Sequence, residues 1–318
     1  MRNVFSAEIT RLAQRDPKVI LLSGDIGNRL FDRFKDQAPD RFFNCGIAEG
    51  NMMGVAAGMA LSGFRPVVYT IAPFTTVRCL EQIRVDVCYH NLPVVIVGTG
   101  AGLAYAELGA THHSCEDVAL LRALPNMTVF CPGDPWELRV GLERSLDLSG
   151  PVYIRLGKKG EPDVHPERPA LQFGKALTLR EGTDVCLITT GTVMPVVMAA
   201  TERLAEAGVS AQVESFHTVK PLDVERLEDL LLRFPVIAII EEHSRIGGLG
   251  GAIAEWRTYS SHVGMSVGGS LPTLLSFALE DAFVHDRASQ ADARREAGLT
   301  VDNVVAGVTT ALANRMRM

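Results

Sequence analysis

Residues 44–60 read NCGIAEGNMMGVAAGMA, the end of a short apolar strand followed by a helix of glycine, alanine and methionine. Gly50, Gly54 and Gly58 recur at every fourth position, so one face of this helix has almost no side chains. Each glycine costs a helix interior roughly 1 kcal/mol relative to alanine. We therefore expect that face to lie against another backbone or a flat ligand, because missing side chains permit close approach.

One carboxylate, Glu49, stands where the strand meets the helix. An acid in the first turn of a helix is favoured by the helix dipole and commonly stays in solvent. Here small or apolar residues flank it, apart from Asn51, which favours a partly buried carboxylate. A carboxyl group removed from water can share a proton with a ligand nitrogen. Glu49 is therefore the first candidate catalytic residue.

Length and composition are those of an ordinary globular protein of two domains: 318 residues, of which 47% are hydrophobic and 21% charged. The net charge of −6 and the scattered arginines give no basic face for nucleic acid or anionic lipid. No apolar run approaches the ~20 residues of a membrane span, and no signal peptide begins the chain. We expect a cytoplasmic protein that binds neither nucleic acid nor membrane. The six cysteines show no metal-ligand spacing.

Short apolar runs alternate with helical patterns through the first half of the chain. The run at 19–22 is followed by Gly24-Asp25-Ile26-Gly27, as in a buried parallel strand that delivers a loop at its carboxyl end. The alternation indicates an α/β domain with a parallel sheet covered on both faces and a site at the carboxyl ends of the strands. Further strands are predicted at 41–45, 66–72, 93–98, 127–131 and 151–156, and helices at 4–15, 28–37, 48–62, 76–90, 116–123 and 134–147.

A charged segment with three prolines, residues 157–169, reads as a linker to a second, smaller α/β unit. We assign residues 1–160 to the first domain, 161–183 to the linker and 184–318 to the second domain. The second domain is expected to have strands at 185–188, 211–216 and 236–240 and helices at 195–207 and 224–233. Another helix should follow residue 251, and residues 272–318 should be helical with irregular breaks.

Gly46-Ile47-Ala48-Glu49 at the start of a small-residue helix resembles the cofactor-activating segment of the transketolase family. Residues 73–78, 109–114, 220–223 and 241–250 match further segments, so the resemblance covers nearly the whole chain. It implies a pyrimidine-binding domain with a parallel sheet, followed by a smaller α/β transketolase C-terminal domain.

The resemblance also implies that one domain of the family is missing. The pyrophosphate-binding domain, which carries a Gly-Asp-Gly motif and the Mg²⁺ ligands, has no counterpart. Gly24-Asp25-Ile26-Gly27 lacks the adjacent second glycine and instead matches a family loop near the pyrimidine, so no metal ligand is assigned here. The chain therefore resembles one subunit of a split transketolase. A separate N-terminal subunit would hold Mg²⁺ and the diphosphate of thiamine diphosphate, and this subunit would pair with itself and with that partner as α2β2.

The resemblance assigns five residues to the cofactor. In the family, the residue matching Glu49 hydrogen-bonds N1′ of the aminopyrimidine of thiamine diphosphate. Phe74 is the expected stacking partner of that ring, and Arg78 opens the next helix and would fix the loop. Asp25 and Ile26 would lie near the ring. Residue type alone leaves a core phenylalanine and a surface arginine as alternatives.

Three further residues are assigned to the substrate. His112 matches the family histidine that contacts the substrate and is the second catalytic candidate, while His113 replaces the usual glutamine; a metal-binding histidine pair is the alternative. Lys158 lies near the position of a phosphate-binding arginine, the alternative being a solvated lysine. Leu108 and Gly100 stand where sugar-specific members have an aspartate and a histidine. Losing two hydrogen-bonding groups predicts a substrate other than the ordinary ketose phosphates.

The leading hypothesis is a thiamine-diphosphate transferase subunit that moves a two-carbon ketol unit from a ketose, with or without phosphate, to an aldehyde. Three alternatives stay open. One is the β subunit of a 2-oxo-acid decarboxylating enzyme, of dehydrogenase E1 type or similar to 1-deoxyxylulose-5-phosphate synthase. Another is a non-catalytic partner subunit. The third is a nicotinamide-dependent dehydrogenase, although residues 98–102 have G-x-G-x-G spacing without the G-x-G-x-x-G register.

Overall fold

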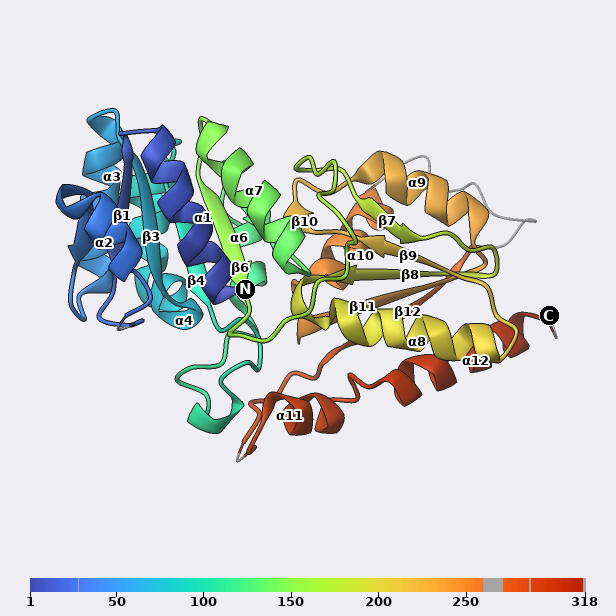
Figure 1. Cartoon of the computed structure of the whole chain (residues 1–318). Coiled ribbons are helices and arrows are strands. Elements are labelled where there is room, and N and C mark those ends of the chain that lie inside the picture. The colour runs from blue at the N-terminus through green and yellow to red at the C-terminus, as the bar shows by residue number, and fades with distance from the viewer. Residues whose placement is uncertain (28, 260–270, 286, 317–318) are drawn as a thin grey trace.

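The computed structural model describes residues 1–27, 29–259, 271–285 and 287–316 and has two α/β domains that lie side by side (Figure 1). The first is built on a seven-stranded sheet of order β10-β5-β6-β4-β3-β1-β2, the second on a five-stranded sheet of order β12-β11-β8-β9-β7. Neighbouring strands run parallel except β10 beside β5 and β7 beside β9. The predicted fold class is confirmed.

The strands of the first sheet are buried on both faces, which explains their continuous apolar runs. In β1, for example, Leu21 packs on one face and Leu22 on the other. The strands are β1 (Val19–Ser23), β2 (Phe42–Asn44), β3 (Arg65–Ile71), β4 (Val95–Thr99), β5 (Thr128–Phe130), β6 (Val152–Leu156) and β10 (Thr218–Lys220).

Helices cover both faces of this sheet. One face packs on α1 (Arg2–Arg15), α2 (Asp32–Gln37) and α7 (Pro135–Asp147). The other packs on α3 (Glu49–Leu61), α6 (Asp117–Arg122) and the helical turns between β3 and β4. The helix predicted at 76–90 is divided into short segments, namely α4 (Ala72–Thr75), η2 (Val77–Cys79), α5 (Leu80–Gln82) and the π-helical η3 (Ile83–Cys88). The helix predicted at 28–37 begins at residue 28, which lies outside the described residues.

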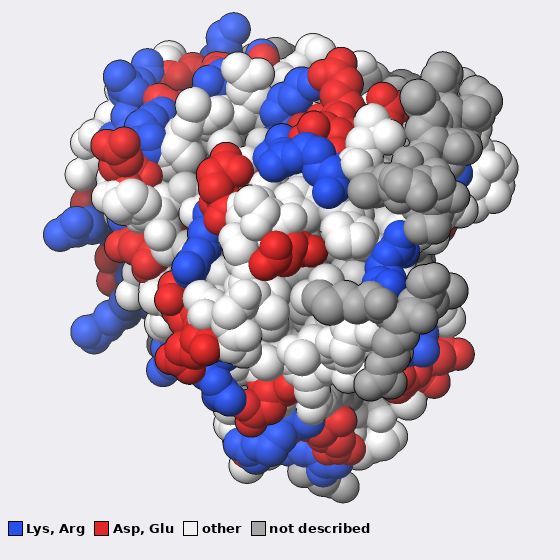
Figure 2. All heavy atoms as spheres, turned by 90° about the vertical axis from the view of Figure 1, so that its right-hand side faces the viewer, with Lys and Arg blue, Asp and Glu red and all other residues white. Residues whose placement is uncertain are grey.

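The second domain follows the same plan on a smaller scale. Its strands are β7 (Leu177–Arg180), β8 (Val185–Thr190), β9 (Ala211–Ser215), β11 (Val236–Ser244) and β12 (Thr273–Leu279). Its helices are α8 (Met194–Glu206), α9 (Val224–Arg233), α10 (Leu249–Tyr259), α11 (Gln290–Glu296) and α12 (Val301–Met316). Figure 2 shows the face of this domain that is turned away from the first domain, where acidic and basic side chains are intermixed with uncharged surface.

Two features of the second domain differ from the predictions. The expectation that residues 272–318 are helical is wrong at Thr273–Leu279, which forms the edge strand β12 beside β11. Periodicity cannot separate a short apolar run in a strand from one in a buried helix, and the available partner strand decides. Within the segment predicted as a linker, β7 pairs with β9. No helix among the described residues is long and apolar enough to span a membrane.

The two domains share a strand and a buried ion pair. β10 follows β9 of the second sheet but completes the first sheet by pairing with β5. At the carboxyl end of β6, the Arg155 guanidinium donates to Asp117 Oδ2 at 2.8 Å, and both side chains are almost fully buried. Arg155 also donates to the backbone carbonyls of Ser114 and Glu242, at 2.7 and 3.1 Å. These bonds offset the cost of burying the charges and connect both domains.

A second buried polar cluster attaches the segment after β6 to α7. Asp134 Oδ2 accepts hydrogen bonds from the backbone N–H of Val164 at 2.9 Å and of His165 at 2.8 Å, and lies 3.1 Å from the His165 ring. Glu137 is fully buried on α7 and accepts a hydrogen bond from Ser215 at the end of β9, at 2.6 Å. The cluster therefore joins α7, the interdomain segment and the second sheet.

The environment of this cluster shifts two pKa values upward. Burial raises the pKa of Glu137 to about 7. Burial lowers the pKa of His165, but its hydrogen bond with Asp134 and the charge of Glu137 outweigh that effect and hold this pKa above its ordinary value. In both cases the folded protein holds a proton more tightly than the unfolded chain does.

We predict that His165 makes the protein less stable as pH rises. A histidine with a raised folded-state pKa stabilises the protein fully below its unfolded pKa, and this contribution is lost as pH rises through the folded value. The free energy of unfolding in urea should therefore fall less between about pH 6 and about pH 8 in His165→Gln than in the wild type. The difference should be below about 1 kcal/mol, because solvent screens part of the interaction.

His285→Gln is the matched control, because His285 is exposed. It should show the wild-type pH dependence. If His165→Gln and the wild type lose equal stability over this pH range, His165 has no such role. Glu137 adds a fall of the same sign as pH rises from its ordinary value of 4.5 to about 7.

Candidate active site

Glu49 is the first residue of α3 and follows the turn that leaves β2. The turn contains Gly46, whose φ of +68° is a conformation that glycine adopts without strain. The Glu49 side chain is 4% exposed, as its small and apolar neighbours predict. The position combines burial with the positive end of a helix dipole, which stabilises a negative charge.

Arg78 and Phe74 lie directly against this carboxylate. Arg78 Nη1 donates to Glu49 Oε2 at 2.8 Å, and the guanidinium carbon is 4.1 Å from the centroid of the Phe74 ring. Phe74 is half-buried on α4, just after β3, so it is not an interior core residue. Arg78 is therefore an ion-pair partner in the site, although half of its side chain is exposed.

The ring of His112 is next to Phe74, with centroids 5.2 Å apart. Its Nδ1 hydrogen-bonds Thr111 Oγ1 at 2.9 Å. Burial and the nearby charges of His113 and Arg78 lower the pKa of His112. The imidazole is therefore neutral near pH 7, so one ring nitrogen can accept a proton.

His113 has a different environment from His112. It is buried, and its Nε2 lies 3.3 Å from the carbonyl oxygen of Ala106. This places the side chain against the backbone of its own loop, where it supports the loop. The part of the chain that the structure describes contains no group of three or more His, Cys, Asp or Glu that could hold a metal ion.

Lys158, which follows β6, is held by two side chains of the loop after β4. Its Nζ lies 4.3 Å from the centroid of the Tyr105 ring and 2.5 Å from Glu107 Oε1. Tyr105 is in turn 6.0 Å from the His112 ring, centroid to centroid. Lys158 is therefore fixed at the site rather than being a solvated linker residue. Tyr105 and Glu107 were not among the residues singled out from sequence.

These contacts form one continuous row of side chains at the carboxyl edge of the first sheet. The supporting strands β6, β4 and β3 are neighbours and parallel, so the loops after them meet at one edge. We call this set the contact row, and it consists of Glu49, Arg78, Phe74, His112, Tyr105 and Lys158.

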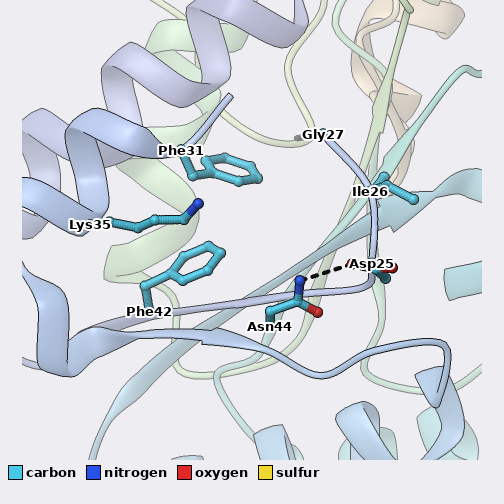
Figure 3. A pocket seen from close by; sticks show the side chains of 7 residues that line it. All are labelled: Asp25, Ile26, Gly27, Phe31, Lys35, Phe42 and Asn44. Atoms are coloured by element: carbon cyan, nitrogen blue, oxygen red, sulfur yellow. Dashed lines mark hydrogen bonds between the residues drawn. The ribbon is translucent and has the colours of Figure 1, made fainter. Parts of the chain in front are cut away.

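Asp25 and Ile26 lie apart from the contact row, in a cavity of about 420 Å³ (Figure 3). None of Glu49, Phe74 and Arg78 lines it; its lining residues are Asp25, Ile26, Gly27, Phe31, Lys35, Phe42 and Asn44. The loop is nevertheless attached to the turn before Glu49. Asn44 Nδ2 donates to Asp25 Oδ1 at 3.0 Å, and the Asp25 N–H donates to the Gly46 carbonyl at 2.9 Å.

The loop that carries His112 is anchored by the second domain. Glu242, buried in β11, accepts a hydrogen bond from the Leu103 N–H at 2.7 Å and from Gln290 Nε2 at 2.9 Å, and it pairs with Arg294. Gly102 permits this approach, because a Cβ there would lie 2.4 Å from Glu242 Oε1. The sequence signal was an acidic pair before a glycine-rich turn, but only the fold shows what Glu242 contacts.

The neighbouring Glu241 has a structural role. Its carboxylate accepts hydrogen bonds from the N–H groups of Leu249 and Gly250, at 2.7 and 2.8 Å, at the start of α10. Burial raises the pKa of Glu241 to about 7. The glycine-rich segment at 247–251 is therefore a tight strand-to-helix turn, as predicted, and its N–H groups are bound by the protein's own carboxylate.

Two descriptions of protein domains match the chain. Residues 1–161 match "Transketolase, pyrimidine binding domain" and residues 174–269 match "Transketolase, C-terminal domain". One of the two subunits of an apulose-4-phosphate transketolase from Phocaeicola vulgatus is 37% identical over 257 residues, which cover 80% of this chain and 82% of that protein. A 6-deoxy-6-sulfo-D-fructose transketolase subunit from a Clostridium species is 37% identical over 256 residues, 80% of each chain.

A longer relative and a solved structure are also similar. A 1-deoxy-D-xylulose-5-phosphate synthase from Chlorobium phaeovibrioides is 36% identical over 303 residues, which cover 94% of this chain but 46% of that protein. Among solved structures, a split gene transketolase described as an inactive β4 tetramer aligns with a TM-score of 0.88 and 35% identity, over 98% of both chains.

We predict that Glu242→Ala loosens the His112 loop without unfolding the first sheet. The variant removes the acceptor of the Leu103 N–H and the partner of Arg294. Hydrogen bonds to a charged group contribute about 1.5–3 kcal/mol, so amide exchange at Leu103 should become roughly tenfold faster or more. Hydrogen exchange measured by mass spectrometry or NMR reads this change directly.

The control is Glu280→Ala, which removes an exposed carboxylate paired with Arg245. It should leave exchange at Leu103 unchanged, and β1 amides should keep their wild-type protection in both variants. Wild-type protection at Leu103 in Glu242→Ala would show that the second domain does not hold this loop.

Proposed function

The chain belongs to the transketolase family, and we propose that it is the cofactor-activating subunit of a split thiamine-diphosphate-dependent transferase. The reaction transfers a two-carbon ketol unit from a ketose or ketose phosphate to an aldehyde. The observation that carries the proposal is the buried carboxylate of Glu49 at the start of α3, beside a half-buried aromatic ring. The similarity to the corresponding subunits of two transketolases supports it.

The residues around Glu49 fit an aminopyrimidine ring. The guanidinium of Arg78 is itself a flat group with N–H donors, and it stacks on Phe74 while donating to Glu49. A heteroaromatic ring with hydrogen-bonding nitrogens makes the same two kinds of contact, a flat face on Phe74 and an edge on the carboxylate. In this proposal Arg78 balances the charge of Glu49 and yields its place when the ring binds. Asp25 and Ile26 support the turn beside it.

Thiamine diphosphate, when bound, supplies the nucleophilic carbon that carries the two-carbon unit between donor and acceptor. Glu49 shares a proton with N1′ of the aminopyrimidine, which is general acid–base catalysis by a buried carboxyl group. His112, neutral near pH 7, takes up and returns a proton at a substrate hydroxyl or carbonyl oxygen. Lys158 binds an anionic group of the substrate, and His113 supports the loop between them.

The surface beside the site supports a requirement for partner subunits. Ile47, next to Glu49, is 86% exposed and Tyr89, after η3, is 80% exposed. The face of α3 at Gly58 is open, since nothing lies within 4 Å of a Cβ placed there. Exposed apolar surface of this kind marks protein interfaces. We propose that it packs against a second copy and a separate N-terminal subunit, as α2β2 in the cytoplasm, with the Mg²⁺ ligands on the N-terminal subunit.

The test is Glu49→Gln in the complex with the N-terminal subunit. The glutamine keeps the shape of the side chain but cannot move a proton, so turnover should fall at least ~100-fold, within the range of general acid–base catalysis. Circular dichroism should show an intact fold. Glu81→Gln, an exposed acid on α5, is the control and should keep wild-type turnover. Near-normal turnover in Glu49→Gln would refute the assignment.

The decarboxylating alternative has a specific observation in its favour, the 36% identity to a 1-deoxy-D-xylulose-5-phosphate synthase over nearly the whole chain. Release of CO₂ from pyruvate by the wild-type complex, without ketol transfer from ketose donors, would establish it instead. If the complex takes up no thiamine diphosphate in calorimetry, the chain is a non-catalytic partner subunit and both enzymatic proposals fail.

A further inference from the structure

Gly100 leaves a gap at the centre of the site, and the ring of Tyr105 fills it. Gly100 directly follows β4 and has a φ of +81°, so a side chain at this position would be strained. A Cβ there would lie 2.0 Å from Tyr105 Cε2 and 2.3 Å from Cδ2. The Tyr105 ring therefore packs against the Gly100 backbone and occupies the space of the missing side chain.

The order of the strands places this ring in the middle of the site. β4 lies between β3, which precedes Phe74, and β6, which precedes Lys158. Tyr105 contacts the residues on both sides, His112 with its ring edge and Lys158 beneath the ammonium group. A substrate that extends from the Phe74 end of the contact row to Lys158 must pass along Tyr105.

The contacts of Tyr105 are those of an apolar wall. The side chain is buried, and its hydroxyl has no hydrogen-bond partner in the described parts of the chain. The wall therefore meets a ligand with the faces and edges of a carbon ring. A substrate hydroxyl pressed against such a surface loses its hydrogen bonds to water without replacement, which lowers binding.

We propose that Tyr105 is a specificity-determining residue, which selects an anionic substrate with no hydroxyl group on the carbon that lies against its ring. The inference rests on the proposed function, because it places the substrate between Phe74 and Lys158. Lys158 takes the anionic group, held in position by Glu107 and by the Tyr105 ring. The substrate class is thus a deoxy aldehyde or deoxy ketose that carries phosphate or a similar anion.

The experiment compares two acceptors that differ by one hydroxyl group, glyceraldehyde 3-phosphate and its 2-deoxy analogue, 3-phosphooxypropanal. Both are assayed with the complete complex of this chain and its N-terminal partner. The wild type should have the higher kcat/KM for the deoxy acceptor. Tyr105→Leu opens the wall to water and should shift the ratio of kcat/KM values toward the hydroxylated acceptor by about tenfold. Tyr105→Phe keeps the ring and should keep the wild-type ratio.

Two outcomes would overturn the inference: an unchanged ratio in Tyr105→Leu, or an equal shift in Tyr105→Phe, which would assign selectivity to the hydroxyl group instead. Calorimetric uptake of thiamine diphosphate separates this failure from failure of the proposed function. Equal uptake by the wild type and both variants, with one ratio throughout, removes only the role of Tyr105. A wild-type complex that takes up no thiamine diphosphate removes the proposed function and this inference with it.

Discussion

A carboxylate held out of water next to a cation is the interaction around which the first domain is arranged. Glu49 is buried at the start of α3, and its charge is balanced by Arg78 and by the positive end of the helix. Such a group is costly to bury, so the surrounding structure must hold both partners in place. Phe74 does this for Arg78 through its ring face. The rest of the contact row extends outward from this pair.

The second domain contributes no side chain to the contact row, yet it determines the shape of the site. Glu242 binds the backbone of the loop that carries Tyr105 and His112, and the Arg155–Asp117 pair connects that loop to β11. A site loop without such anchors would be mobile, because loops have few internal contacts. The family's two-domain plan therefore has a mechanical reason in this chain: one domain supplies the residues and the other holds their loop.

The contact row also explains why its residues belong to different kinds of chemistry. Its inner end pairs a buried acid with an aromatic ring, while its outer end presents an ammonium group over a second ring. Low local dielectric strengthens interactions at the inner end, whereas Lys158 at the outer end is more open to solvent. A proton-transfer function suits the first environment and anion binding the second.

The sequence by itself determined the α/β class, because continuous apolar strands and alternating helices are local patterns. It also identified Glu49 as a buried acid from its neighbours, and it singled out Phe74, Arg78, His112 and Lys158 through the family resemblance. Local patterns could not show that 273–279 is a strand, because only the partner strand β11 makes it one. Nor could they show that Tyr105 fills the space over Gly100, or that Glu242 holds the loop. Those contacts join residues that are brought together by strand order and domain packing, which are properties of the folded chain as a whole and leave no periodic trace in the sequence.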